Sequence, residues 1–280
     1  MGALADRMEQ DLVLRGRSRV TITTYLQRAR QFVRFHMKSP EEMGEEEIRD
    51  FLRHLVVERK AGPEVLRSHI ASLKFLFGVT LRRPEAVSWI PWPRKRKRLP
   101  EVLAQQEVID LIAAAGSPRM RAVIMLGYGS GLRISEIRSL VPGDIDSKRG
   151  VILVRAGKGN KDRIAPLSPT LLAALRDYWR QTRPRGPYLF PGGKPGQPIS
   201  KQALHKPYKA ALRRAGIERQ IGFHALRTAF ATHLLESGVD LLTIQHLLGH
   251  TWFSSSLCYL RVRTDHLLAA GSPLDRLPAS

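Results

Sequence analysis

The sequence predicts a mainly helical protein of two domains, with a small β-sheet confined to the second domain. Apolar residues recur every three or four positions through most of the chain, which is typical of amphipathic helices. β-Branched residues form one short pair of strands, and a basic, proline-rich segment divides the chain near its first third. With 280 residues and a hydrophobic fraction of 43%, the chain can build a core in each domain.

The first domain, residues 1–93, is predicted to be a bundle of about four helices. A helix near residues 5–14 opens it. Residues 48–56 and 66–77 show the helical spacing again, the former after three glutamates that suit a helix N-terminus and the latter after Gly62-Pro63. The helix between them and the first one carries an apolar stripe made of Ile22, Tyr25, Leu26, Ala29, Phe32, Val33 and His36.

A charged linker is expected between the two domains at residues 94–100. Residues 89–100 contain three prolines and a run of five cations, Arg94, Lys95, Arg96, Lys97 and Arg98. Proline stiffens the chain and like charges keep it extended, as in interdomain linkers. These cations are candidate phosphate contacts, and the alternative is a solvated charged turn.

The second domain is predicted to mix helices with one β-hairpin. Residues 151–155 and 162–165 are the two strands, and the glycine-rich turn between them contains Lys158. Ser168 and Ser200 are expected to cap helices, and Gly249 to end one. The predicted helices cover residues 108–115, 121–128, 168–179, 200–214, 223–236 and 240–248.

The charge balance indicates a polyanionic partner. Lys and Arg number 46 against 25 Asp and Glu, a formal net charge of +21. Residues 1–93 contribute +4 and residues 94–280 contribute +17. A folded protein this basic commonly binds nucleic acid. The sequence shows neither a signal peptide nor an apolar run long enough for a membrane span, so a cytoplasmic, nucleoid-associated protein without membrane contact is expected.

The sequence lacks the residues that several common kinds of chemistry require. The single cysteine, Cys258, excludes an internal disulfide and a thiolate cluster within one chain. Neither a nucleotide-binding P-loop nor a G-x-S-x-G elbow is present. His246 and His250 are four residues apart, but no third metal ligand accompanies them. We therefore expect no cofactor and no metal.

The remaining candidates form an ordered set of short motifs. His224 and Arg227 are three residues apart, on one helical face, where an imidazole and a guanidinium can address one small anion. The whole set comprises Gly131-Leu-Arg-Ile-Ser-Glu136, Gly157-Lys-Gly159, His224-Ala-Leu-Arg227, Leu248-Gly-His250 and Tyr259. In this order the motifs resemble those of the tyrosine site-specific recombinases and phage-type integrases, including Xer-like and integron-integrase-like members. The resemblance covers residues 99–260 well, and the first domain only in length and helical character.

This resemblance implies a role for each motif residue. Arg133 and Arg227 would hold the non-bridging oxygens of the scissile phosphate, and Glu136 would orient the site. His224 and His250 would hydrogen-bond the phosphate and assist proton movement, with His224 as the acid–base participant.

The resemblance also implies the covalent chemistry. Tyr259 would be the nucleophile that forms a 3′-phosphotyrosyl bond, so that strands are cleaved and rejoined without metal or ATP. Lys158 would be the general acid that protonates the departing 5′ oxygen, and Lys161 on the same turn is the alternative acid.

The architecture implied by the resemblance is a two-domain DNA clamp. Residues 1–93 would be a helical, SAM-like core-binding domain for DNA, and residues 101–280 the α+β catalytic domain with a C-terminal tail. The expected partners are double-stranded DNA with inverted core sites and three further copies of the chain, which form a homotetramer on paired sites. An accessory DNA-bending protein is left open.

Related activities remain as alternatives. A type IB topoisomerase-like enzyme shares the chemistry but acts as a monomer, and a DNA-binding regulator of the same fold would lack catalysis. Residues 270–277 are similar to the end of integron integrases, whereas residues 186–222 are too few for the insertion of those enzymes. We therefore expect a transposon- or plasmid-type integrase or a Xer-like resolvase, acting in integration, excision or resolution of a mobile element.

Overall fold

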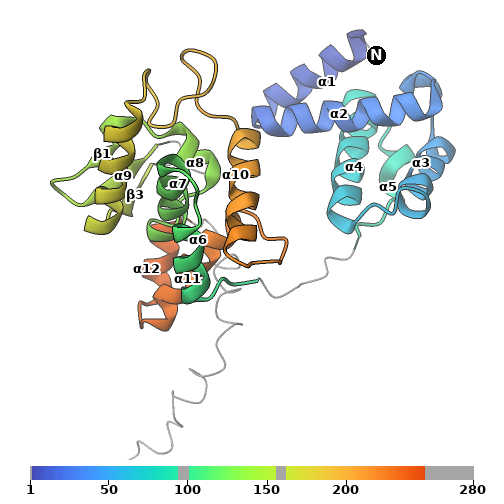
Figure 1. Ribbon diagram of the computed structural model, residues 1–280. Helices are drawn as coiled ribbons and strands as arrows, with labels where there is room; N and C mark the ends of the chain where they lie inside the picture. Colours follow the sequence, from blue (N-terminus) through green and yellow to red (C-terminus); the bar gives the residue numbers. More distant parts are fainter. Residues whose placement is uncertain (1, 94–100, 156–161, 250–280) are drawn as a thin grey trace, which may run out of the picture. The chain divides into compact units, whose positions relative to one another are not determined.

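The computed structural model describes residues 2–93, 101–155 and 162–249 (Figure 1). These residues are mainly helical with one three-stranded sheet, which confirms the predicted fold class. The chain divides into two compact units, residues 1–97 and 98–280. The expected linker with its five cations lies outside the described residues. No helix in the described part of the chain has the length and hydrophobicity of a membrane span.

The N-terminal unit is a helical bundle whose helix starts follow from local sequence. The hydroxyl of Ser18 accepts a hydrogen bond from the main-chain N–H of Thr21 and so caps the second helix. Three glutamates occupy the first turn of the third helix, and Pro63 opens the fourth. The helices are α1 Gly2–Leu14, α2 Arg19–His36, α3 Glu45–Val57, α4 Pro63–Phe75 and α5 Glu85–Ser88, with a 3₁₀ turn at Pro40–Glu42 and a π-helical turn at Leu76–Thr80.

Aromatic side chains join these helices in one core. Phe32 on α2 packs edge-to-face against Phe51 on α3 and Phe77, with ring centroids 5.4 and 5.9 Å apart. The predicted fourth helix runs too far, because the α-helix ends at Phe75 and continues as the π-helical turn. Phe77 is nevertheless fully buried, so the apolar pattern identified a core residue although the helix type was wrong.

The C-terminal unit contains seven α-helices among its described residues. Ser117, Ser168, Ser200 and Asp240 each cap a helix through a side-chain oxygen. The sequence did not predict α8, since six residues are too few to show a helical period. The helices are α6 Gln105–Ala113, α7 Pro118–Gly129, α8 Ile134–Ser139, α9 Pro169–Thr182, α10 Lys201–Arg214, α11 His224–Glu236 and α12 Leu241–Leu248, and a 3₁₀ turn covers Pro142–Asp144.

The sheet of this unit is small and antiparallel, in the order β1-β2-β3. Its strands are β1 Ile145–Asp146, β2 Val151–Val154 and β3 Arg163–Pro166. The predicted hairpin strands are confirmed, with Val151 opposite Pro166 and Val154 opposite Arg163. The sequence did not predict strand β1, because two residues are too few to show a strand pattern. The turn between β2 and β3, with Lys158 and Lys161, lies outside the described residues.

Two central helices, α7 and α11, form much of the core of the C-terminal unit. Residues 225–232 on α11 and 122–127 on α7 are all buried. Close packing needs a small residue at the contact, and Gly127 supplies it, because a Cβ there would lie 3.0 Å from Cδ1 of Leu226. Since α11 begins with His224 and carries Arg227 one turn later, this packing places both residues at the end of a rigid element.

We expect Gly131→Ala to destabilise the C-terminal unit. Gly131 has a φ of +61°, and a Cβ would lie 2.6 Å from Cδ1 of Phe230. The left-handed backbone costs about 1–2 kcal/mol and overpacking about 1–3 kcal/mol more. Urea unfolding should show the loss. Gly143→Ala is the matched control, since nothing lies within 4 Å of its added Cβ. Equal midpoints for the two variants would contradict this account of Gly131.

Candidate active site

The candidate site is built around the buried carboxylate of Glu136, in the first turn of α8. Its Oε2 accepts a hydrogen bond from the main-chain N–H of Arg133 at 2.8 Å, and its Oε1 accepts one from Arg133 Nη1 at 2.8 Å. Acidic residues at this position commonly satisfy a free N–H at a helix start. The local sequence Arg-Ile-Ser-Glu therefore fixes the direction of the Arg133 side chain, which is 24% exposed.

Two further arginines approach the same carboxylate from other elements. Arg163 on β3 donates from Nη2 to Oε2 of Glu136 at 2.7 Å, and Nη1 of Arg227 lies 3.9 Å from the same oxygen. Burial raises the pKa of Glu136, but Arg163 and the two hydrogen bonds from Arg133 lower it by more, and the net pKa falls below its ordinary value. One carboxylate thus faces three guanidinium groups, and the cluster keeps an excess of positive charge.

Arg163 is the residue that sequence reasoning missed. The sequence placed it on the returning strand of the hairpin but indicated no role for it. In the structure its side chain is buried, and besides Glu136 it binds the main-chain carbonyl of Leu247 through Nη1 at 2.7 Å. One feature of the sequence could have indicated this role, namely an arginine at an inward position of a short strand. A buried arginine requires a partner, so such a position predicts an ion pair.

Arg227 is 1% exposed and joins two loops through its guanidinium. Nη1 donates to the carbonyl of Gly131 at 2.7 Å, and Nη2 donates to the carbonyl of Leu248. The start of α11 is thereby tied both to the α7–α8 connection and to the end of α12. The resemblance implies that Arg227 would hold a phosphate oxygen, and in the structure its two terminal nitrogens each donate to a main-chain carbonyl.

The end of α12 is held by the same arginines. Gly249 ends this helix with a φ of +60°, and a Cβ there would lie 2.7 Å from Cδ of Arg163. Only glycine combines the left-handed backbone with this close approach. His250 follows directly in the chain but lies outside the described residues, as does Tyr259. Arg163 and Arg227 therefore fix the chain up to the residue before His250.

The hairpin is attached to this site at two points. The hydroxyl of Ser130, fully buried before Gly131, donates to the carbonyl of Pro166 on β3 at 2.6 Å. Arg163 at the other end of β3 binds Glu136. Strand β3 is thus anchored at one end to the α7–α8 connection and at the other end to α8.

His224 opens α11 and keeps a side chain accessible to solvent. The protein packed behind the ring lowers its pKa, and the positive charges of Arg227 and Arg133 lower it further. Its ring is therefore neutral at pH 7. The two cations that lower the pKa of His224 are thus Arg133 and Arg227, which the sequence predicted as residues of the same site.

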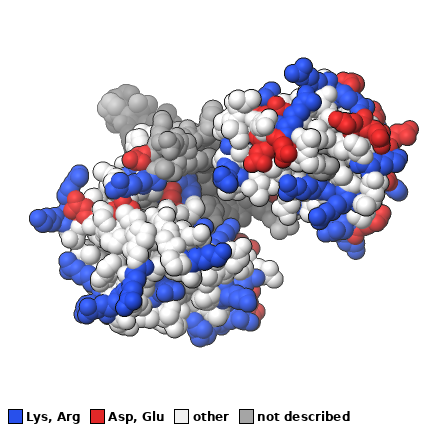
Figure 2. Space-filling view, turned by 90° about the horizontal axis from the view of Figure 1, so that it is seen from above, with Lys and Arg blue, Asp and Glu red and all other residues white. Residues whose placement is uncertain are grey.

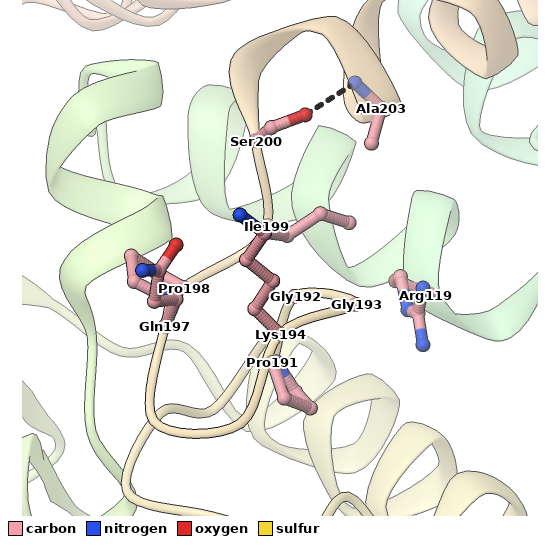
Figure 3. A pocket seen from close by; sticks show the side chains of 10 residues that line it. All are labelled: Arg119, Pro191, Gly192, Gly193, Lys194, Gln197, Pro198, Ile199, Ser200 and Ala203. Atoms are coloured by element: carbon pink, nitrogen blue, oxygen red, sulfur yellow. Dashed lines mark hydrogen bonds between the residues drawn. The ribbon is translucent and has the colours of Figure 1, made fainter.

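A basic hollow of about 560 Å³ lies elsewhere in the C-terminal unit, beside the start of α10 (Figure 3). Arg119 and Lys194 are its cations, and the hydroxyl of Ser200 at its edge accepts the N–H of Ala203 at 3.0 Å. None of the predicted site residues that the structure describes lines it. The predicted chemistry is thus centred on the Glu136 cluster and not on this hollow.

Comparison with known proteins agrees with this arrangement. Residues 101–266 match the model of the Phage integrase family, and residues 4–86 match that of the phage integrase N-terminal SAM-like domain. The chain belongs to the phage integrase family. Members of this family similar to it include the integrase/recombinase y4qK of Sinorhizobium fredii, 41% identical over 99% of this chain and 90% of that protein.

Other relatives of this phage integrase are Xer recombinases. The tyrosine recombinase XerA of Pyrococcus horikoshii is 34% identical, over 92% of this chain and 89% of that protein. Among solved structures, a XerA recombinase has a TM-score of 0.55 at 26% identity, over 100% of this chain and 99% of that one. The XerH recombinase bound to palindromic difH substrate has a TM-score of 0.72 at 22% identity, over 93% of this chain and 82% of that one, and shows the fold alone. The predicted family and the predicted recombinase activity are confirmed.

We expect Arg163→Met to destabilise the C-terminal unit by about 1–3 kcal/mol, because Glu136 loses one of its three guanidinium partners and the Leu247 carbonyl loses its donor. Urea unfolding at pH 7 measures the loss. Arg219→Met, at a part-exposed pair with Glu107, is the control and should cost about 0–1 kcal/mol.

The difference in unfolding free energy between wild type and Arg163→Met should depend on pH in a defined direction. The lowered pKa of Glu136 contributes stability above its unfolded pKa of about 4.3, and that contribution is lost as the pH falls through the folded value. The gap between wild type and Arg163→Met should therefore narrow at acid pH. A gap that is independent of pH would contradict the ionic account.

We expect Arg133→Gln to raise the pKa of His224 towards its ordinary value, because one of the two nearby positive charges is removed. A nuclear magnetic resonance titration of the His224 ring in DNA-free protein measures this. Arg176→Gln, an exposed cation on α9, is the control and should leave the His224 pKa unchanged. An unchanged pKa in Arg133→Gln would place His224 outside the cluster.

Proposed function

We propose that this recombinase cleaves and rejoins DNA strands through a 3′-phosphotyrosyl intermediate, without metal or ATP, in the integration, excision or resolution of a mobile element. The observation that supports this most directly is the cluster of three guanidinium groups around the single carboxylate of Glu136, with the neutral ring of His224 beside it. The excess positive charge suits a phosphodiester.

The arginines would act on the charge of the transition state. Attack on a phosphodiester concentrates negative charge on the non-bridging oxygens, and fixed guanidinium groups stabilise that charge without reorganising. Arg133, which is part-exposed, is the more accessible of the two proposed phosphate ligands. The positive charge of Arg227 would also stabilise the phosphate. Its guanidinium would bind the phosphate in a position set by the carbonyls of Gly131 and Leu248.

Glu136 would act as a positioning residue. It accepts hydrogen bonds from two arginines and holds neither a proton nor a free edge for substrate, because its pKa is lowered and its side chain is 7% exposed. Arg163 supports it from the hairpin side. Orientation of Arg133 by this carboxylate agrees with the role expected from the motif.

His224 would exchange a proton during the reaction. Its lowered pKa leaves an imidazole that can accept a proton in the free enzyme. A bound phosphate brings negative charge that opposes the two arginines and raises the pKa, which favours proton uptake at the moment of strand cleavage.

The remaining catalytic roles rest on the motifs outside the described residues. Tyr259 would attack the scissile phosphate, and Lys158, or Lys161 on the same turn, would protonate the leaving 5′ oxygen. His250 would hydrogen-bond the phosphate. The described chain supports this assignment on both sides, since β3 and the end of α12 are each attached to the Glu136 cluster.

The charge distribution supports DNA as the substrate. Figure 2 shows acidic side chains gathered on the N-terminal unit, whereas the visible face of the C-terminal unit is mainly blue and white. Residues 94–280 carry a net charge of +17, including the cations 94–98. We propose that both units contact double-stranded DNA at inverted core sites and that four copies assemble on paired sites.

Related structures support the assembly by analogy. XerH is described bound to difH substrate, and a lambda integrase tetramer is described bound to a Holliday junction. A monomeric type IB topoisomerase-like enzyme would form the same covalent bond but would not exchange strands between two sites. Recombination between two sites on separate DNA molecules distinguishes the two activities.

We expect Tyr259→Phe to abolish covalent attachment to DNA while leaving binding nearly unchanged. The substitution removes one hydroxyl, the proposed nucleophile, and keeps the ring. On a nicked substrate that traps the intermediate, wild-type protein should become attached to a 3′ phosphate in the presence of a chelator. Denaturing electrophoresis measures the adduct, and a mobility-shift assay measures binding.

Tyr188→Phe serves as the matched control and should form the adduct at the wild-type rate, because this tyrosine belongs to none of the motifs. An adduct that persists in Tyr259→Phe would refute the assignment of the nucleophile. Cleavage that requires magnesium would refute the metal-free mechanism.

A further inference from the structure

A second concentration of guanidinium groups lies within the N-terminal unit, far in sequence from the catalytic motifs. A groove of about 470 Å³ opens between α2, α3 and the start of α4. Its lining includes Arg28 and Arg34 on α2, Arg59 just after α3, and His69 on α4. All of these residues belong to one compact unit, so the groove is complete within it.

None of the residues that line this groove is acidic, and the carboxylate of Glu58, next to Arg59 in the chain, pairs with the lining residue His54 at 2.7 Å. Arginines on the outer face of α3 behave differently, because Arg49 pairs with Glu45 at 2.6 Å and Arg53 with Asp50 at 3.1 Å. In the groove, Nη1 of Arg28 donates to the amide oxygen of Gln31, and its buried Nε has no hydrogen-bond partner among the described residues. An anion would neutralise this charge and supply the missing acceptor.

His69 adds a buried polar group to the same groove. It is 2% exposed, packs at 5.5 Å against the ring of Phe51, and its Nδ1 has no hydrogen-bond partner in the described part of the chain. Burial lowers its pKa to about 4, and the charges of Arg28 and Arg59 contribute. A neutral ring with an unpaired buried nitrogen beside two arginines is an uncommon arrangement in a folded protein.

We propose that this groove binds a phosphate group through Arg28, Arg59 and His69. Guanidinium groups bind phosphate oxygens in paired geometry, and a neutral imidazole can donate one further hydrogen bond. The phosphate can come from the DNA backbone or from free phosphate. The DNA source rests on the proposed function and adds a defined phosphate contact to it, whereas the free source does not depend on it.

The test for the DNA source is the salt dependence of binding by the full chain to duplex DNA of arbitrary sequence. Arg28→Gln and Arg59→Gln should each flatten the plot of log affinity against log salt by about 0.9. Arg7→Gln is the matched control. Arg7 is an exposed residue of α1 outside the groove, and its substitution removes one positive charge, as the groove variants do. Equal slopes for wild type, Arg28→Gln and Arg59→Gln would overturn the DNA source.

The test for the free source uses inorganic phosphate. In the DNA-free full chain, labelled histidine resonances of His69, assigned with His69→Gln, should shift as phosphate is added to millimolar concentration. Arg59→Gln, at an exposed position, should remove the shift, whereas Arg7→Gln should keep it. A shift with unchanged salt slopes identifies free phosphate as the ligand. No shift together with unchanged slopes overturns the proposal.

These outcomes are independent of the covalent chemistry. A protein that forms no adduct through Tyr259 but loses salt dependence in Arg28→Gln would refute the proposed function and retain the phosphate groove. A protein that forms the adduct and shows neither the slope change nor the shift would retain the proposed function and refute the groove.

Discussion

The C-terminal unit depends on the ionised carboxylate of Glu136. Three guanidinium groups, from Arg133, Arg163 and Arg227, approach one another in a largely buried space, which their mutual repulsion and desolvation would prevent without an anion. One carboxylate makes the cluster stable but does not neutralise it. The positive charge that remains would attract a phosphodiester, so the excess of arginines that makes the fold depend on Glu136 would also suit the proposed DNA substrate.

Two glycines allow the backbone to close around this cluster. Gly131 and Gly249 both have left-handed backbones, and a side chain on either would collide with a neighbour, Phe230 in the first case and Arg163 in the second. Their freedom lets the α7–α8 connection and the end of α12 approach closely enough for Arg227 to bind a carbonyl in each. The segments that lead to the proposed acid and to His250 are thereby fixed to the carboxylate that orients Arg133.

The two units differ in whether a carboxylate of the chain lies beside their clustered arginines. In the Glu136 cluster a buried carboxylate from the chain itself is the partner of the arginines, and a bound substrate would add to an existing network. In the groove of the N-terminal unit no carboxylate lines the space around Arg28 and Arg59, and the buried His69 keeps an unpaired nitrogen. In the proposed function the first arrangement would be preorganised for chemistry, and the second is proposed as an anion site that its ligand would complete. Both serve a protein whose overall charge of +21 already favours a polyanion.

The sequence by itself determined the helical class, the hairpin, the family, and the grouping of Arg133, Glu136, His224 and Arg227, because helical period, capping residues and short motifs are local signals. It extended the fourth helix past Phe75 and missed α8, where a change of helix type and a short length leave no periodic trace. Tertiary structure alone decided that Arg163 joins the site, since it meets Glu136 across 27 positions and the Leu247 carbonyl across 84. It also decided that Arg227 is buried and that Arg28, Arg59 and His69 share one groove. Such contacts depend on which faces of distant elements pack together, and that is set by the whole core and not by any local segment.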